Sequence, residues 1–119
     1  MDELKKALDS LARVLSEPKS DIARDAAIQR FEFSVELSWK ASKKIMGSHS
    51  SAPKMIVREM ATSGFIDDVT FWLEAIDKRN LSSHTYQEAL AEEVYEFAID
   101  FLPEARKLWD RLEKIVGKN

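Results

Sequence analysis

Residues 31–40 read Phe-Glu-Phe-Ser-Val-Glu-Leu-Ser-Trp-Lys, and the architecture of the chain depends on the conformation of this decamer. Apolar and polar residues alternate strictly in it, which taken alone is typical of a half-buried strand. Neither end of the decamer carries a turn signal, however, and the flanking residues 22–29 and 41–46 both read as helix. We therefore predict one helix of more than twenty residues, which begins near residue 20 and meets no breaker until Gly47.

A helix over these residues is apolar on two sides. At about 100° per residue, one side carries Phe31, Val35 and Trp39, and the nearly opposite side carries Ile22 and Phe33. Such a helix either lies at the centre of a bundle, or covers the core with one side and a second subunit with the other. In a chain of 119 residues the second arrangement has real weight, so we expect a homodimer.

The N-terminal half is predicted to be helical on both sides of this segment. Leucines recur at intervals of three or four residues from Leu4 to Leu15, which indicates an amphipathic helix over about residues 2–16. After a polar loop, Pro53 suits the first position of a short helix, which Gly64 closes.

The C-terminal half is predicted to hold further helices. Asp67 or Asp68 caps the first, which ends near residues 79–80. Thr85-Tyr86-Gln87-Glu88 has the spacing of a capping box and starts the next helix, which Pro103 kinks or restarts. Together these elements predict an all-α, up-and-down bundle of four main helices plus short extra ones, with residues 1–119 forming a single domain.

The composition excludes several classes of protein. Cysteine is absent, which excludes disulfides and thiolate chemistry, and the spacing of the two histidines suggests no metal site. The longest stretch without a charged residue, residues 45–53, is too short and too polar for a membrane span, and the first residues are acidic, unlike a signal peptide. We therefore expect a cytoplasmic protein that spans no membrane, holds no metal and needs no cofactor.

Acidic residues concentrate in one part of the chain. Between Glu59 and Glu104, eleven Asp and Glu residues stand against two basic ones, a net charge of −9, whereas the remaining residues sum to +6. Basic residues gather within residues 40–44 and again near the end of the chain. Because no continuous basic face emerges, we interpret both groups as solvated surface rather than as a nucleic-acid site.

One polar loop combines residue types that suit phosphodiester chemistry. Residues 79–86 read Arg-Asn-Leu-Ser-Ser-His-Thr-Tyr. A guanidinium is well shaped to hold a phosphate, and a neutral imidazole is a competent general base near pH 7. Arg79 and His84 could therefore cleave a phosphodiester by activating a 2′-hydroxyl without a metal. Alternatively, the loop is structural: Arg79 bonds the carbonyls that end its helix, and His84 hydrogen-bonds across the loop.

At these residues the sequence resembles a known family. Arg-x4-His-x-Tyr, filled here by Arg79, His84 and Tyr86, is the signature of the HEPN superfamily in its HepT and nucleotidyltransferase substrate-binding branch. The resemblance spans nearly the whole chain. It extends through residues 24–33, 36–40, 58–59, 64–68 and 77–86, together with Pro53.

The resemblance implies a helical bundle that forms a homodimer, in which the two Arg-His loops face one another across a cleft. It also implies a partner, a minimal nucleotidyltransferase usually encoded nearby, in a two-component complex or a toxin–antitoxin pair. In toxin-like members the paired loops form a metal-independent RNase, where the position of His84 does acid or base work and that of Arg79 stabilises the phosphate. Asn80 matches a polar residue that often follows the arginine. Tyr86 matches the tyrosine that the partner modifies with AMP, which silences the site.

Two other functions stay open. Some relatives are described only as substrate-binding subunits, so the first alternative is a non-catalytic subunit that presents a nucleotide or substrate to the transferase. The acidic segment around Arg79 and His84 would repel RNA, and it suits contact with a basic partner protein. The second alternative is a structural adaptor bundle whose loop only connects two helices.

Overall fold

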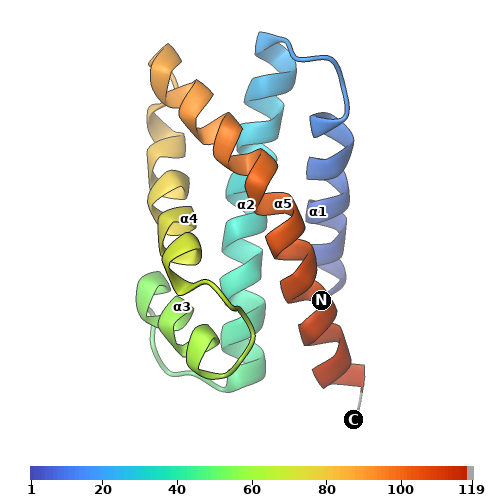
Figure 1. Cartoon of the computed structure of the whole chain (residues 1–119), viewed down its shortest axis with the longest axis vertical. Helices are drawn as coiled ribbons and strands as arrows, with labels where there is room; N and C mark the ends of the chain where they lie inside the picture. Colours follow the sequence, from blue (N-terminus) through green and yellow to red (C-terminus); the bar gives the residue numbers. More distant parts are fainter. Residues whose placement is uncertain (118–119) are drawn as a thin grey trace.

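The computed structural model describes residues 1–117, and most of them are helical. The elements are α1 (Asp2–Leu15), α2 (Asp21–Met46), α3 (Pro53–Thr62), α4 (Val69–Leu81), the short 3-10 helix η1 (Ser82–His84) and α5 (Glu88–Gly117). In Figure 1, α1 and α4 run upward, α2 and α5 run downward, and α3 lies at the lower end. The all-α, up-and-down bundle predicted from the sequence is thereby confirmed.

The alternating decamer is helical along its whole length, as predicted. At the start of α2, the Ser20 hydroxyl oxygen accepts a hydrogen bond of 3.0 Å from the Ala23 amide. At its end, Gly47 adopts a φ of 67°, a left-handed conformation that favours glycine. Both caps lie well outside the decamer, so the helix passes through the alternating residues without a break.

Three serines show how an alternating sequence fits a buried helix. Ser34, Ser38 and Ser42 lie fully inside the bundle. Each hydroxyl donates a hydrogen bond to the carbonyl four residues earlier, at 2.8, 2.7 and 2.8 Å respectively. Because the hydroxyl is satisfied by the helix itself, these polar residues avoid the penalty for an unpaired buried donor.

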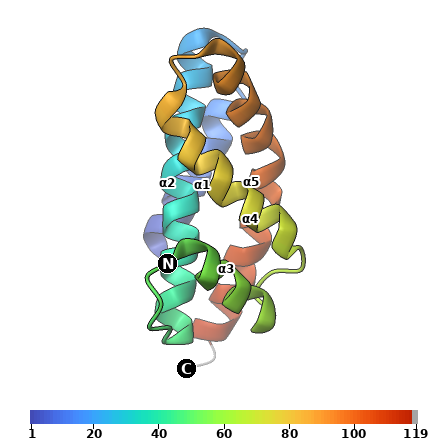
Figure 2. The same ribbon diagram turned by 90° about the vertical axis from the view of Figure 1, so that its left-hand side faces the viewer.

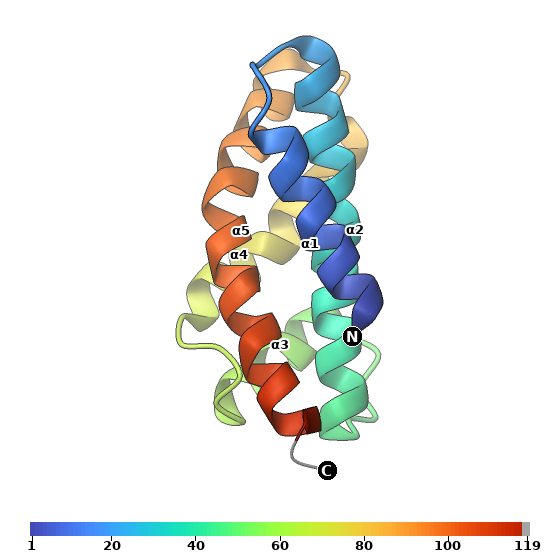
Figure 3. The same ribbon diagram turned by 90° about the vertical axis from the view of Figure 1, so that its right-hand side faces the viewer.

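Aromatic rings form the centre of the core. Phe31 of α2 meets Phe101 of α5 edge-on, with ring centroids 5.1 Å apart and an interplanar angle of 85°. Trp72 of α4 meets the same Phe101 ring at 5.2 Å. Fully buried Leu4 and Leu8 extend this core from α1, which lies alongside α2 and against α5 (Figure 3). The core thus fixes α4 and α5 against α2 (Figure 2).

The two apolar sides of α2 differ in their surroundings. Phe31, Val35 and Trp39 are buried in the core, whereas Ile22 is 84% exposed and Phe33 is 52% exposed. The prediction of two apolar sides is confirmed, since one side faces the core and the other faces solvent. The homodimer inferred from the second side stays a prediction.

Several predicted boundaries are confirmed. Pro53 opens α3, and the Asp68 carboxylate caps α4 by accepting a hydrogen bond of 3.0 Å from the Phe71 amide. The end of α4 at Leu81 lies within a residue or two of the expected position. Among residues 1–117, no helix combines the length and apolar character needed to cross a membrane.

One predicted detail is wrong, and one alternative for another is excluded. Thr85 does not cap a helix, because its hydroxyl donates to Ser82 O at 3.2 Å and α5 begins only at Glu88. Of the two alternatives left open for Pro103, a kink or a restart, the restart is excluded, because α5 runs through Pro103 without a break. Pro103 is exposed, and buried residues on both sides of it, including Phe101 and Leu108, hold the two halves of α5 on the core. Core packing therefore outweighs the missing backbone donor.

Candidate functional site

The residues predicted to be functional lie at one end of the bundle, where α4 gives way to α5 (upper end in Figure 1). Arg79 and Asn80 belong to the last turn of α4, and His84 closes η1. Tyr86 stands in the turn between η1 and α5. The sequence therefore places all four on one connection, and the tertiary structure packs that connection against α2.

Arg79 is held by carboxylates of α2. Its Nε donates to Glu36 Oε1 at 2.7 Å, and its Nη2 lies 3.5 Å from Glu32 Oε1. Lys40 Nζ lies 3.5 Å from the second oxygen of Glu36, so the cluster contains two cations and two carboxylates. The Arg79 side chain is 29% exposed and keeps some access to solvent. The structural alternative, in which Arg79 bonds the carbonyls that end α4, is therefore not what the structure shows.

Ser82 links the same cluster to the start of η1. Its hydroxyl lies 2.8 Å from Glu32 Oε2 and 2.5 Å from Arg79 O, and the residue is 7% exposed. Glu32 therefore contacts both Arg79 and Ser82, and it fixes the end of α4 on α2. The loop leaves the bundle surface only after this point.

His84 and Tyr86 project from the surface. Tyr86 is 79% exposed, and its ring lies 6.2 Å from the His84 ring at an angle of 72°. The Gln87 amide donates to His84 O at 3.2 Å, which shapes the turn between them. Asn80 is also exposed, and its carbonyl accepts a hydrogen bond of 3.1 Å from the Ser83 hydroxyl. The side chain of Tyr86 is thus open to a second molecule.

The four predicted residues share the connection from the end of α4 to the start of α5 but form no closed catalytic cluster in one chain. In the part of the chain that the structure describes, no hydrogen bond joins Arg79 to His84. Sequence reasoning missed Glu32, Glu36 and Ser82 as members of the site. The available signal was the polar stripe of α2, in which Glu32 and Glu36 are one turn apart on the same face.

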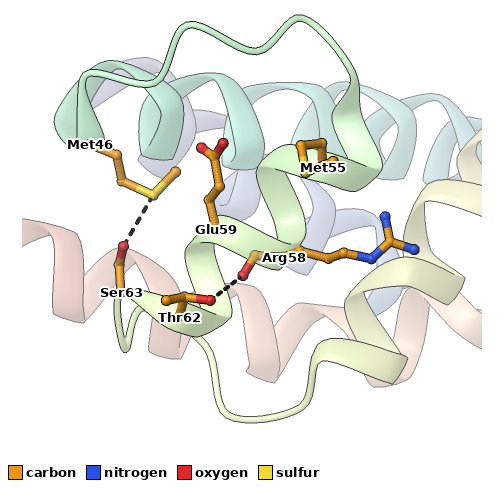
Figure 4. A pocket seen from close by; sticks show the side chains of 6 residues that line it. All are labelled: Met46, Met55, Arg58, Glu59, Thr62 and Ser63. Carbon is orange, nitrogen blue, oxygen red and sulfur yellow. Dashed lines mark hydrogen bonds between the residues drawn. The ribbon is translucent and has the colours of Figure 1, made fainter.

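A hollow in the surface lies far from this loop, between α3 and the end of α2 (Figure 4). Its volume is about 370 Å³, and it contains none of the predicted site residues. The Ser63 hydroxyl bonds Met46 Sδ across it at 3.5 Å, while the guanidinium of Arg58 extends away from it. It is lined by Met46, Met55, Arg58, Glu59, Thr62 and Ser63. Within residues 1–117, no group of three or more carboxylate or imidazole ligands is arranged to hold a metal ion.

Two solved structures share this helical fold and define the class of the protein. The bundle matches a protein of Thermus thermophilus with a TM-score of 0.85 and 33% identity, over 92% of this chain and 98% of that one. It also matches HI0074 from Haemophilus influenzae with a TM-score of 0.82 and 31% identity, over 94% of this chain and 98% of that one. HI0074 is described as having the fold of a substrate binding domain of a nucleotidyltransferase. The fold is that of this class of helical domain.

Sequence comparison then gives the family. Residues 1–114 match the family described as nucleotidyltransferase substrate binding protein like, and the chain belongs to that family. A Haemophilus influenzae protein named as a probable ribonuclease HepT is 36% identical over 96 residues, which cover 74% of this chain and 66% of that protein. The resemblance inferred from the Arg-His-Tyr loop and its surroundings is confirmed at the level of the family.

Proposed function

We propose that this protein is the partner subunit of a minimal nucleotidyltransferase, the HepT-like component of a toxin–antitoxin pair, and that Arg79, Asn80, His84 and Tyr86 form its functional loop. The observation that carries the proposal is the exposure of His84 and Tyr86 on a loop whose arginine is fixed by α2. Family membership over residues 1–114 and the likeness to the substrate binding domain of a nucleotidyltransferase support the choice of partner.

The proposed chemistry is metal-independent cleavage of RNA between two copies of the loop. The imidazole of His84 removes the proton of a 2′-hydroxyl, and the 2′-oxygen then bonds to the adjacent phosphorus. The bond from phosphorus to the 5′-oxygen breaks, and that oxygen takes up a proton from the imidazolium of His84 in the second copy. The products are a 2′,3′-cyclic phosphate and a free 5′-hydroxyl. Arg79 stabilises the charge on the phosphate, and Asn80 supports its binding.

A homodimer would supply the second loop. The exposed side of α2, with Ile22 and Phe33, is the surface we assign to contact with a second copy of the chain. The resemblance implies this pairing, because in that family the two Arg-His loops face one another across a cleft. The catalytic groups would then be completed across the cleft.

The partner is proposed to silence the loop by modifying Tyr86. The phenol oxygen attacks the α-phosphorus of ATP, AMP becomes attached to the oxygen, and pyrophosphate leaves. The 79% exposure of Tyr86 gives the transferase the access that this step requires. The added phosphate is negative and lies beside His84, so it would repel the RNA backbone from the loop.

Two linked measurements test this function. The protein is co-expressed with the transferase encoded beside it, and mass spectrometry searches Tyr86 for an added AMP of about 329 Da. RNA cleavage by the unmodified protein is then compared between His84→Ala and His49→Ala. His49 is the matched control, since it is the other histidine and is exposed in a different loop. We expect AMP on Tyr86 of the co-expressed protein. In the cleavage assay, His84→Ala should lose activity and His49→Ala should keep it; equal activity of the two variants would contradict the catalytic role of His84.

A second function is favoured by the neutralisation of Arg79. Because Glu32 and Glu36 already contact its guanidinium, and the segment around it is strongly acidic, the surface of one chain offers RNA little net attraction. A non-catalytic subunit that presents a nucleotide or substrate to the transferase would show a stable complex without cleavage and without modified Tyr86. A structural adaptor would bind neither nucleotide nor transferase.

A further inference from the structure

Arg24, in the first turn of α2, is a buried charge to which the proposed function gives no role. The residue is only 5% exposed, and its guanidinium lies where the start of α2 meets the start of α5. Its Nη1 donates to Glu88 and, at 3.1 Å, to Glu92 Oε1, while its Nε donates to Asp25 Oδ1 at 3.2 Å. Asp21 adds a more distant charge at 3.9 Å.

The carboxylates around Arg24 hold it in the charged form. The hydrogen bonds to Glu88 and Glu92 raise the pKa of Arg24, and burial opposes this only in part. The pKa of Glu92 is lowered, first by Lys19 and then by Arg24. The Glu88 side chain is 72% exposed, so Arg24 is the buried anchor and Glu88 is the surface group that it retains.

The position of Glu88 connects this cluster to the loop. Glu88 is the first residue of α5 and follows Tyr86 by two positions. At the other end of the loop, Ser82 is attached to Glu32. Arg24 and Glu32 are eight residues apart on α2, a separation of about 12 Å along a helix axis. One rigid helix therefore holds both ends of the loop.

We propose that Arg24 is a positioning residue for the functional loop: by holding Glu88 at the start of α5, it fixes His84 and Tyr86 relative to Arg79. The inference rests on the proposed function for its catalytic consequence. Its structural part, the ordering of residues 83–87 by an ion pair to α2, is independent of that function. The hydrogen bonds of the Arg24 side chain go to carboxylates, so its effect on His84 and Tyr86 passes through Glu88.

Another arginine provides a matched control for a merely structural ion pair. Arg111 of α5 also makes two contacts between segments, to Phe65 O at 3.1 Å and to Asp67 Oδ2 at 2.7 Å. It lies in the second half of α5, away from the loop, and binds the connection between α3 and α4. Arg111→Gln should therefore weaken the fold without affecting the loop.

The test compares Arg24→Gln, Glu88→Gln, the double variant and Arg111→Gln. Hydrogen exchange of amides 83–87 is measured first, because it reports the order of the loop whether or not the protein has activity. We expect at least tenfold faster exchange in Arg24→Gln and in Glu88→Gln, no further increase in the double variant, and no change in Arg111→Gln. Glu88→Gln alters an exposed side chain, so it gives a folded variant if Arg24→Gln does not fold.

The catalytic readouts follow from the same set of variants. Cleavage of RNA should fall at least tenfold in kcat in Arg24→Gln and Glu88→Gln, with little change in KM, because both residues lie outside the substrate site. Arg24→Lys, which keeps the charge opposite Glu88, should recover part of this loss. Unchanged loop exchange in both single variants would overturn the proposal. If the wild-type protein neither cleaves RNA nor accepts AMP on Tyr86, the proposed function fails, and the exchange data alone still decide whether Arg24 orders the loop.

Discussion

A comparison of Trp39 and Phe33 tests whether one side of α2 packs in the core and the other contacts a second copy of the chain. Both are large aromatic residues of one helix, but Trp39 is 9% exposed in the core and Phe33 is 52% exposed on the opposite side. Replacing a buried Trp by Ala typically costs about 3–5 kcal/mol. Within residues 1–117 the buried Nε1 of Trp39 lacks a hydrogen-bond partner, and removal of an unsatisfied group offsets part of that cost, roughly 1 kcal/mol or more.

We therefore expect Trp39→Ala to lower the free energy of unfolding by about 2–4 kcal/mol. Phe33 gains only about half of the 1.5–3 kcal/mol that full burial provides, so Phe33→Ala should cost about 1 kcal/mol in the monomer. The free energy of unfolding of a small protein falls by about 1.5 kcal/mol per molar urea, so a loss of about 3 kcal/mol lowers the urea concentration at half-unfolding by about 2 M.

The two variants should also differ in how strongly they dimerise. Sedimentation at micromolar concentration should show a weakened dimer for Phe33→Ala, and Trp39→Ala should assemble like the wild-type protein under conditions where it is folded. Unfolding is measured on samples dilute enough to be monomeric, so that lost assembly is not mistaken for lost stability. A loss of stability in Phe33→Ala as large as in Trp39→Ala, or a Phe33→Ala dimer of unchanged strength, would refute the assignment of the two sides.

Three further predictions concern single positions. Glu92 has a pKa below its ordinary value of 4.5, so its carboxylate stabilises the fold above that pH, and this contribution is lost as the pH falls through the lowered pKa. Urea titrations from about pH 6 to about pH 3 measure the free energy of unfolding at each pH. That free energy should decline less steeply with falling pH in Glu92→Gln than in the wild-type protein. Glu36→Gln removes a negative charge bonded to Arg79, so fluorescence anisotropy should show RNA binding several-fold tighter, whereas Glu113→Gln in the last turns of α5 should not change it. Pro103→Ala restores a backbone donor at an exposed position inside α5 and should raise the free energy of unfolding by about 1–3 kcal/mol; a lower thermal midpoint would contradict this expectation.

The position of Arg79, His84 and Tyr86 on one connection could be predicted from the sequence, but the residues that contact this connection could not. Arg79, His84 and Tyr86 stand within eight residues of one another, so a short motif places them on one connection. The contacts that orient this connection come from far along the chain: Glu36 lies 43 residues before Arg79, and Arg24 lies 64 residues before Glu88. The capping-box prediction fails for the same reason, since Glu88 pairs with Arg24 instead of capping a helix with Thr85.

Local structure follows from the order of the residues: a helix through the alternating decamer, its two apolar sides, its ends near Ser20 and Gly47, and the place of the polar loop. These features depend on the spacing of residues within a few turns, which can be read along the chain directly. Only in the folded bundle does it emerge that α5 continues through Pro103 and that Glu32 and Glu36 meet the end of α4. Such contacts depend on how the helices rotate and cross, and the packing of Phe31, Trp72 and Phe101 sets that arrangement only when the whole chain has folded.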